Sequence, residues 1–180
     1  MVLAVLRTRW GAGGGRAKFG GLLYDAAVPG PDGRTRRVML FAPQLYMNRS
    51  GEAVKGLLEF YEAQPSQVLI VLDDMALPSG HLRARASGSG GGHNGLENVL
   101  KLMETHDIPR LRIGIDAAPP EIDAADYVLA RFDAPQLERI EPAIERAANA
   151  VEDWIAFDIM YVMDKYNRKT ERPTGDPHET

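Results

Sequence analysis

The sequence predicts a single-domain α/β sandwich, and three observations support this prediction. Segments with strand-like patterns alternate with segments of helical periodicity, which is typical of α/β folds. The run VLIVL at Val68–Leu72 is wholly apolar and of strand length, as expected in the middle of a sheet that is covered on both faces. The chain has 180 residues, 44% hydrophobic and 26% charged, which suits one domain with a hydrophobic core.

Two strands are expected near the start of the chain. Gly11–Gly15 and Pro29–Gly33 are rich in glycine and proline, so both predict loops. Between them, Lys18–Ala27 alternates in character and predicts a strand. Arg36–Ala42 predicts a second strand, which Pro43 ends.

A helix and the apolar strand Val68–Leu72 follow. The helix is expected over Glu52–Ala63, with Ser50 as its N-cap. Its apolar residues recur at helical spacing and predict one inward face, formed by Val54, Leu57, Leu58 and Tyr61.

The second half alternates in the same way. His81–Arg85 predicts an edge strand, Ser87–Gly92 a loop, and the residues from Gly95 to His106 a helix. Leu111–Ile115 predicts a short strand, and Ala124–Arg131 a helix. One or two long helices are expected over Pro135–Tyr166, with these residues facing inward: Ile140, Ile144, Ala147, Val151, Trp154 and Ile155. The domain is thus expected over residues 1–166, followed by a polar, disordered tail over 167–180.

Composition limits the classes of function. The chain has no cysteine, which excludes disulfides and thiolate chemistry. No apolar run approaches the length of about 18 residues needed to span a bilayer, and no basic leader precedes the first apolar stretch, so we expect a cytoplasmic protein without membrane attachment. Residues 1–113 carry a net charge of +4 and residues 114–180 one of −8. A nucleic-acid partner should therefore contact residues 1–113. The candidate arginines there are Arg34, Arg36, Arg37, Arg83 and Arg85. The alternative is that these arginines are merely solvated surface residues.

Three motifs carry candidate chemistry. In PQLYMNRSG (Pro43–Gly51), Asn48 precedes a helix, where its carboxamide could bind a ligand or simply shape the turn. Asp73 and Asp74 follow the apolar strand, where α/β folds usually place their sites. Asp73 could orient an imidazole or merely solvate a loop, and no third ligand at regular spacing supports a metal. GSGGGHNG (Gly88–Gly95) has five glycines that let its backbone approach a ligand, with His93 and Asn94 at the next helix entry.

In this order and spacing, the motifs resemble those of the bacterial peptidyl-tRNA hydrolase family. The matching segments are YMNRSG at Tyr46–Gly51, LDDMALPSG at Leu72–Gly80, GGGHNG at Gly90–Gly95, RLRIGI at Arg110–Ile115 and ADYVLARF at Ala125–Phe132, so the resemblance covers about residues 17–160. It implies a twisted mixed sheet flanked by helices. It also implies hydrolysis of the ester between a peptide and the 3′ adenosine of tRNA, which recycles tRNA from stalled translation, by a monomer without metal or cofactor.

The resemblance assigns roles to individual residues. Asp73 matches the family's catalytic aspartate, which holds the base histidine. Tyr46, Asn48 and Asn94 match residues that contact the substrate or tRNA in the family. Met47 and His93 lie beside them. Ala76 stands where the family has a further aspartate, a departure we expect to be minor.

A larger departure lies at the start of the chain. The family begins with a strand, a GLGNPG loop and a segment bearing the base histidine, and no counterpart precedes YMNRSG here. Residues 1–10 resemble the helix that follows that segment. Three hypotheses account for this: a start placed too far downstream of the true one, a degenerate inactive copy, or a relative that binds tRNA or RNA and has lost hydrolysis. His93 as a substitute base paired with Asp73 is a fourth hypothesis, which its substrate-side position disfavours.

Overall fold

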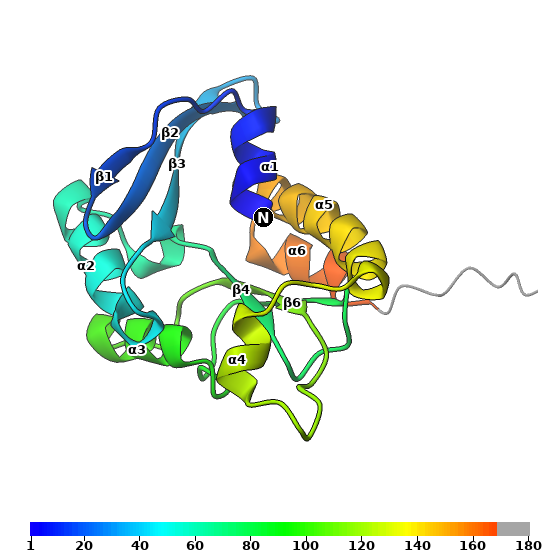
Figure 1. Cartoon of the computed structure of the whole chain (residues 1–180). Coiled ribbons are helices and arrows are strands. Elements are labelled where there is room, and N and C mark those ends of the chain that lie inside the picture. Colours follow the sequence, from blue (N-terminus) through cyan, green and yellow to red (C-terminus); the bar gives the residue numbers. More distant parts are fainter. Residues whose placement is uncertain (169–180) are drawn as a thin grey trace, which may run out of the picture.

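The computed structural model describes residues 1–168, and its strands form two three-stranded sheets (Figure 1). The first sheet is antiparallel and contains β1 (Arg16–Lys18), β2 (Gly21–Pro29) and β3 (Thr35–Pro43), in that order. β3 confirms the strand expected over Arg36–Ala42, and β2 confirms most of the strand expected over Lys18–Ala27. Lys18 itself belongs to β1, which was not expected and which the turn at Phe19–Gly20 separates from β2. Across this sheet Tyr24 pairs with Leu40.

The second sheet is mixed. It contains β4 (Ile70–Asp74), β6 (Arg110–Gly114) and β5 (Leu82–Arg85), in the order β4-β6-β5. β4 runs parallel to β6, and β5 runs antiparallel to it. The edge position expected for His81–Arg85 is confirmed. The central position expected for Val68–Leu72 is wrong, because β4 has a strand on one side only and Ile70 and Val71 stay partly exposed.

Six α-helices accompany the sheets within the described residues. They are α1 (Val2–Arg9), α2 (Ser50–Tyr61), α3 (Asn94–Met103), α4 (Ala124–Leu129), α5 (Ala134–Ala156) and α6 (Ile159–Tyr166). The α/β class and the flanking helices are confirmed, although the strands form two sheets where a single sheet was expected. Short 3-10 turns lie at Met47–Arg49 (η1) and Pro65–Gln67 (η2).

The start of α2 differs from the prediction. Ser50 is the first helical residue and not the N-cap, which is Arg49 and makes no side-chain capping bond. The reason is that η1 leads directly into α2, so Ser50 already has helical backbone angles and its hydroxyl donates to the Met47 carbonyl at 2.9 Å.

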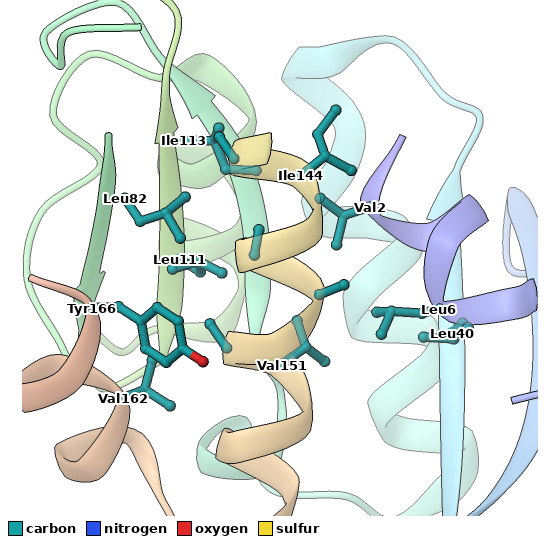
Figure 2. Close-up of a cluster of buried hydrophobic side chains, with 14 of the residues drawn as sticks. Val2, Leu6, Leu40, Leu82, Leu111, Ile113, Ile144, Val151, Val162 and Tyr166 are labelled. Carbon is teal, nitrogen blue, oxygen red and sulfur yellow. The ribbon is translucent and has the colours of Figure 1, made fainter. Parts of the chain in front are cut away.

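Helix α5 carries the main core. It lies between β5 and β6 on one side and α1 and β3 on the other (Figure 2). The side chains of Ile140, Ile144, Ala147 and Val151 are buried as predicted, while Trp154 and Ile155 are only partly buried. A second apolar cluster packs α2 and α3 against β4 and the segment before β6 through Leu58, Leu72, Leu96, Val99 and Ile108, among others.

The last described residues are attached to the second sheet. Asn167, which the sequence places in the tail, accepts a hydrogen bond from the Ala84 N–H at 2.6 Å and donates one to the Ala84 carbonyl at 3.0 Å. The first residue of the expected tail thus contacts β5, and residues 169–180 of that tail lie outside the described residues.

Helix α6 is joined to α5 at Asp153, and this contact gives a first prediction. The buried Tyr166 hydroxyl donates to Asp153 Oδ2 at 2.6 Å, and burial, with this carboxylate, raises the pKa of Tyr166 to about 12. Tyr166→Phe should lower the free energy of unfolding by about 1.5–3 kcal/mol, because a hydrogen bond to a charged acceptor is lost. Urea unfolding measures this loss.

Tyr161→Phe, on a more exposed part of α6, is the matched control and should change stability little. The stabilisation that the Tyr166 hydroxyl provides depends on pH. Its stabilisation is present below the unfolded pKa of about 10 and is lost as pH rises through the folded pKa. An equal effect of both substitutions would contradict this assignment.

Candidate active site

Three elements meet at the candidate site: the carboxyl end of β4, the start of α3 and the turn η1. β4 ends in Asp73 and Asp74, and His93 is the N-cap of α3. η1 packs against α3, where Met47 lies so close to Gly95 that a side chain at that glycine would contact the methionine sulfur. The structure therefore brings together the regions of all three sequence motifs.

Asp73 faces His93. Asp73 Oδ1 lies 3.8 Å from His93 Nε2, longer than a direct hydrogen bond, and the two side chains are 43% and 19% exposed. The His93 side chain lowers the pKa of Asp73 below its ordinary value, while partial burial acts in the opposite direction. Asp73 is therefore a carboxylate at neutral pH.

The other ring nitrogen of His93 has a structural task. His93 Nδ1 accepts a hydrogen bond from the backbone N–H of Leu96 at 3.1 Å and so caps α3. An acceptor nitrogen carries no proton, so the neutral ring holds its proton on Nε2, which faces Asp73. Neither ring nitrogen is then available to take a proton from water, which argues against His93 as the base.

This arrangement gives a second prediction, on His93. His93→Ala should destabilise the fold by about 1 kcal/mol through loss of the cap, whereas His93→Asn, which can still cap α3, should not. Both variants should raise the pKa of Asp73, which carbon NMR of its carboxyl group measures.

The sign of the acid dependence follows from the lowered pKa. The stability that Asp73 contributes in the wild type is present above its unfolded pKa and lost as pH falls through its folded pKa. In both His93 variants the loss of stability at acid pH should be smaller than in the wild type. An unchanged pKa of Asp73 would show that the imidazole does not act on it.

The adjacent acid Asp74 is structural. Its side chain is buried, Oδ1 accepts from the Ala76 N–H at 2.9 Å, and Oδ2 lies 3.0 Å from Arg112 Nε. The two neighbouring acids thus point to different partners. The described residues contain no cluster of three or more histidine or acidic side chains suited to a metal ion.

A buried arginine that sequence reasoning missed holds the glycine loop. Arg110 is 2% exposed and donates to the carbonyls of Gly88 at 2.9 Å and His106 at 3.3 Å. Burial is the largest cause of its lowered pKa, and the nearby Arg112 charge acts in the same direction. The alternation of RLRIG predicts a strand, but nothing in it separates a buried arginine from a solvated one.

The three remaining candidates lie on the surface beside these groups. Tyr46 is 82% exposed, and Asn48 and Asn94 are exposed too. Asn48 is in η1, and Asn94 directly follows the cap His93. Asn98, a residue that the motifs did not single out, accepts from the Gly51 N–H at 2.7 Å and joins α3 to the start of α2. Asn48, in the turn that leads into α2, and Asn94, at the start of α3, therefore lie on segments that this hydrogen bond links.

Comparisons with known proteins agree on one family. The family model described as "Peptidyl-tRNA hydrolase" matches residues 1–174. Peptidyl-tRNA hydrolase of Bacillus cytotoxicus is 36% identical over 167 residues, which are 93% of this chain and 87% of the relative. That of Brevibacillus brevis is 34% identical, with 93% and 86% covered.

Solved structures give the same result. A crystal structure of peptidyl-tRNA hydrolase with n-propanol matches with a TM-score of 0.84 at 25% identity, over 95% of this chain and 85% of that one. The enzyme from Acinetobacter baumannii matches with a TM-score of 0.82 at 26% identity, over 92% and 82%.

Proposed function

Since this chain belongs to the peptidyl-tRNA hydrolase family, we propose that it hydrolyses the ester bond between the peptide and the tRNA of peptidyl-tRNA, and so recycles tRNA from stalled translation. The observation that supports this most directly is the ionised Asp73, at the end of β4 and beside the start of α3. His93, from the motif GGGHNG, lies 3.8 Å from its carboxylate.

The reaction needs a water molecule to attack the ester carbonyl. A base takes a proton from this water, and the 3′ oxygen of the tRNA leaves and takes a proton in turn. A carboxylate stabilises the positive charge that a base such as imidazole acquires in this step. We assign this supporting role to Asp73, because its charge is fixed at neutral pH and its side chain is partly open to solvent; the base itself is not assigned to any of residues 1–168.

The substrate contacts are proposed for the exposed groups around Asp73. The carboxamides of Asn48 and Asn94 can donate to peptide carbonyls and accept from ribose hydroxyls. The exposed Tyr46 ring offers a stacking surface for a base, and Met47 of η1 packs against α3 at Gly95. His93 positions Asn94 by capping the helix on which it lies.

A second candidate function is tRNA or RNA binding without hydrolysis. Under this alternative His93 would serve only its structural task, the cap of α3 through the bond from the Leu96 N–H to Nδ1. Under this alternative the groups around Asp73 would still hold the acceptor end of tRNA, but no group would activate water.

The arginines named as nucleic-acid contacts differ in what they touch. Arg36 donates to the Ile155 carbonyl at 2.7 Å, and Arg37 pairs with Asp25 at 2.7 Å. Arg85, at the end of the edge strand β5, is exposed. Among these three, Arg85 has the position best suited to a phosphate.

One pair of assays tests the proposal. Purified chain is mixed with N-acetylated aminoacyl-tRNA as the peptidyl-tRNA substrate, and release of the amino acid is followed; filter binding of the uncharged tRNA is measured in parallel. We expect turnover with the acetylated substrate and much less with free aminoacyl-tRNA. Binding without turnover would overturn hydrolysis and support the second candidate, and absence of both would overturn both.

We also propose a cytoplasmic monomer, as the substrate class and the family suggest. No helix in the described part of the chain is long and apolar enough to cross a membrane. Sedimentation velocity at micromolar concentration should give a single species near the 19.8 kDa of the chain.

A further inference from the structure

Helix α2 begins without a cap from its own side chains. Its N-cap Arg49 makes no side-chain capping bond, and the Ser50 hydroxyl donates to the Met47 carbonyl. The first N–H groups of a helix have no acceptor within that helix, and Gly51, whose N–H is one of them, is buried. A buried N–H group without an acceptor is costly, so that of Gly51 requires an acceptor from another element.

Asn98 of α3 supplies this acceptor. Its side-chain oxygen Oδ1 accepts a hydrogen bond from the Gly51 N–H at 2.7 Å. The two helices lie so close here that a Cβ at Gly51 would lie 2.5 Å from the backbone oxygen of Asn98. The start of α2 is therefore capped across the helix interface, by a side chain that lies 47 positions further along the chain.

The same face of α3 also contacts the turn η1. Gly95 lies three residues before Asn98, which places both on one face of the helix. A Cβ at Gly95 would lie 2.5 Å from the sulfur of Met47, so the methionine packs directly on the backbone of α3. Asn94 lies about one turn before Asn98 on this helix. One helix face thus holds both η1 and the start of α2, and Asn94 stands at its N-terminal end.

The segment between β3 and α2 is held at both ends. At its start the Gln44 N–H donates to the Gly20 carbonyl at 2.8 Å. At its end the Gly51 N–H donates to Asn98. Between these bonds, η1 contacts α3 through the apolar Met47 side chain. An apolar contact has no preferred direction, so the orientation of η1 on α3 depends on the hydrogen bond of Asn98.

We propose that Asn98 is a positioning residue for the substrate site, which fixes Asn48 on η1 relative to Asn94 on α3 through its bond to Gly51. This inference rests on the proposed function, in which both carboxamides hold the same substrate. A displacement of about 1 Å between groups that hold a substrate can cost about 10²-fold in rate. Asn98 thus acts through the other two asparagines and has no part in the chemistry itself.

Substitutions of Asn98 separate the hydrogen bond from the shape of the side chain. Asn98→Leu has the same branched shape and no acceptor, so it leaves the Gly51 N–H without a partner. Asn98→Asp keeps an acceptor oxygen, and its negative charge is favourable at the start of α2. Asn98→Ala, which removes the acceptor without adding volume, replaces Asn98→Leu if the leucine variant does not fold. Tyr166→Phe, which removes a hydrogen bond of α6, is the control for stability.

Steady-state hydrolysis of the acetylated aminoacyl-tRNA gives the first readout. We expect Asn98→Leu to raise KM about tenfold and to lower kcat as well, because misaligned carboxamides bind the substrate more weakly. Asn98→Asp should keep KM within about twofold of the wild type, because the acceptor is retained. Tyr166→Phe should leave KM unchanged, since a loss of stability alone reduces only the amount of folded enzyme and hence kcat.

A second readout needs no turnover. In the wild type the Met47 side chain lies against Gly95, so NMR should detect a nuclear Overhauser effect between the γ protons of Met47 and the α protons of Gly95. We expect this effect to weaken in Asn98→Leu and to persist in Asn98→Asp. The amide hydrogen of Gly51 should exchange faster with solvent in Asn98→Leu only.

Other results would overturn the proposal. An unchanged KM in Asn98→Leu would mean that Asn98 does not act on the substrate site, and an unchanged Overhauser effect would mean that η1 keeps its place without the hydrogen bond. A KM raised equally in Asn98→Asp would mean that the bond to Gly51 is not the cause. If the wild type showed no turnover, the proposed function would fail, and the Overhauser effect in the two variants would still decide whether Asn98 fixes η1 on α3.

Discussion

Asp73→Asn should lower the rate of peptidyl-tRNA hydrolysis by about 10²–10⁴-fold, the range expected when support of a general base is lost. Asparagine has nearly the same shape, so the fold should remain. It has no charge, however, and cannot stabilise the positive charge that the base acquires as it takes the proton from water. The interaction with His93 keeps the pKa of Asp73 low, so the wild-type side chain is ionised throughout the neutral range.

Single-turnover hydrolysis of the acetylated aminoacyl-tRNA measures this loss, with tRNA binding measured beside it. We expect the rate constant of the chemical step to fall while binding stays within about twofold, because a supporting carboxylate acts in the transition state. Asp126→Asn, at an exposed carboxylate on α4, is the matched control and should leave the rate unchanged. If Asp73→Asn hydrolyses as fast as this control, the role assigned to Asp73 is wrong.

Gly114→Ala should destabilise the protein by about 3 kcal/mol or more, a large part of the 5–15 kcal/mol that usually separates folded from unfolded domains. A Cβ at Gly114 would overlap the backbone oxygen of Pro78 and lie 2.8 Å from that of Leu77. Backbone atoms cannot turn away as a side chain can, so β6 or the Leu77–Pro78 segment must move. Because Gly114 pairs with Asp74 across the sheet, the shift would also reach the candidate site.

Chemical denaturation of the two alanine variants tests this effect. Gly13→Ala is the control, since a Cβ there meets no atom within 4 Å and the backbone needs no left-handed conformation. It should be neutral or slightly stabilising, through the smaller freedom of the unfolded chain. If both variants unfolded at a similar denaturant concentration, the packing described at Gly114 would be contradicted.

Local patterns were sufficient to predict most of the elements. The alternation in Arg36–Ala42 and the helical spacing in Glu52–Ala63 reflect contacts within one element or with its nearest layer, and both elements form nearly where expected. The position of Val68–Leu72 depended on a strand elsewhere in the chain. Its apolar character correctly predicted a strand, but β4 has a neighbour on one side only.

The candidate site was predictable in outline for the same reason. Asp73 and His93 were singled out separately, and the structure places them 3.8 Å apart because β4 and α3 meet in one apolar cluster. Two other features depend on the orientation of single side chains. They are the helix cap formed by His93 and the hydrogen bond from Arg110 to the Gly88 carbonyl. No periodicity in the sequence contains that information.

The position of α5 between the two sheets has a consequence for how the molecule opens. Within residues 1–168 no backbone ladder joins β3 to β4, so the sheets are connected through apolar side chains, chiefly those around Ile144 and Val151. A fluctuation that parts the sheets breaks dispersion contacts but leaves every interstrand bond intact. Each sheet should then behave as a separate cooperative unit, which loses its protection in its own step when denaturant is raised.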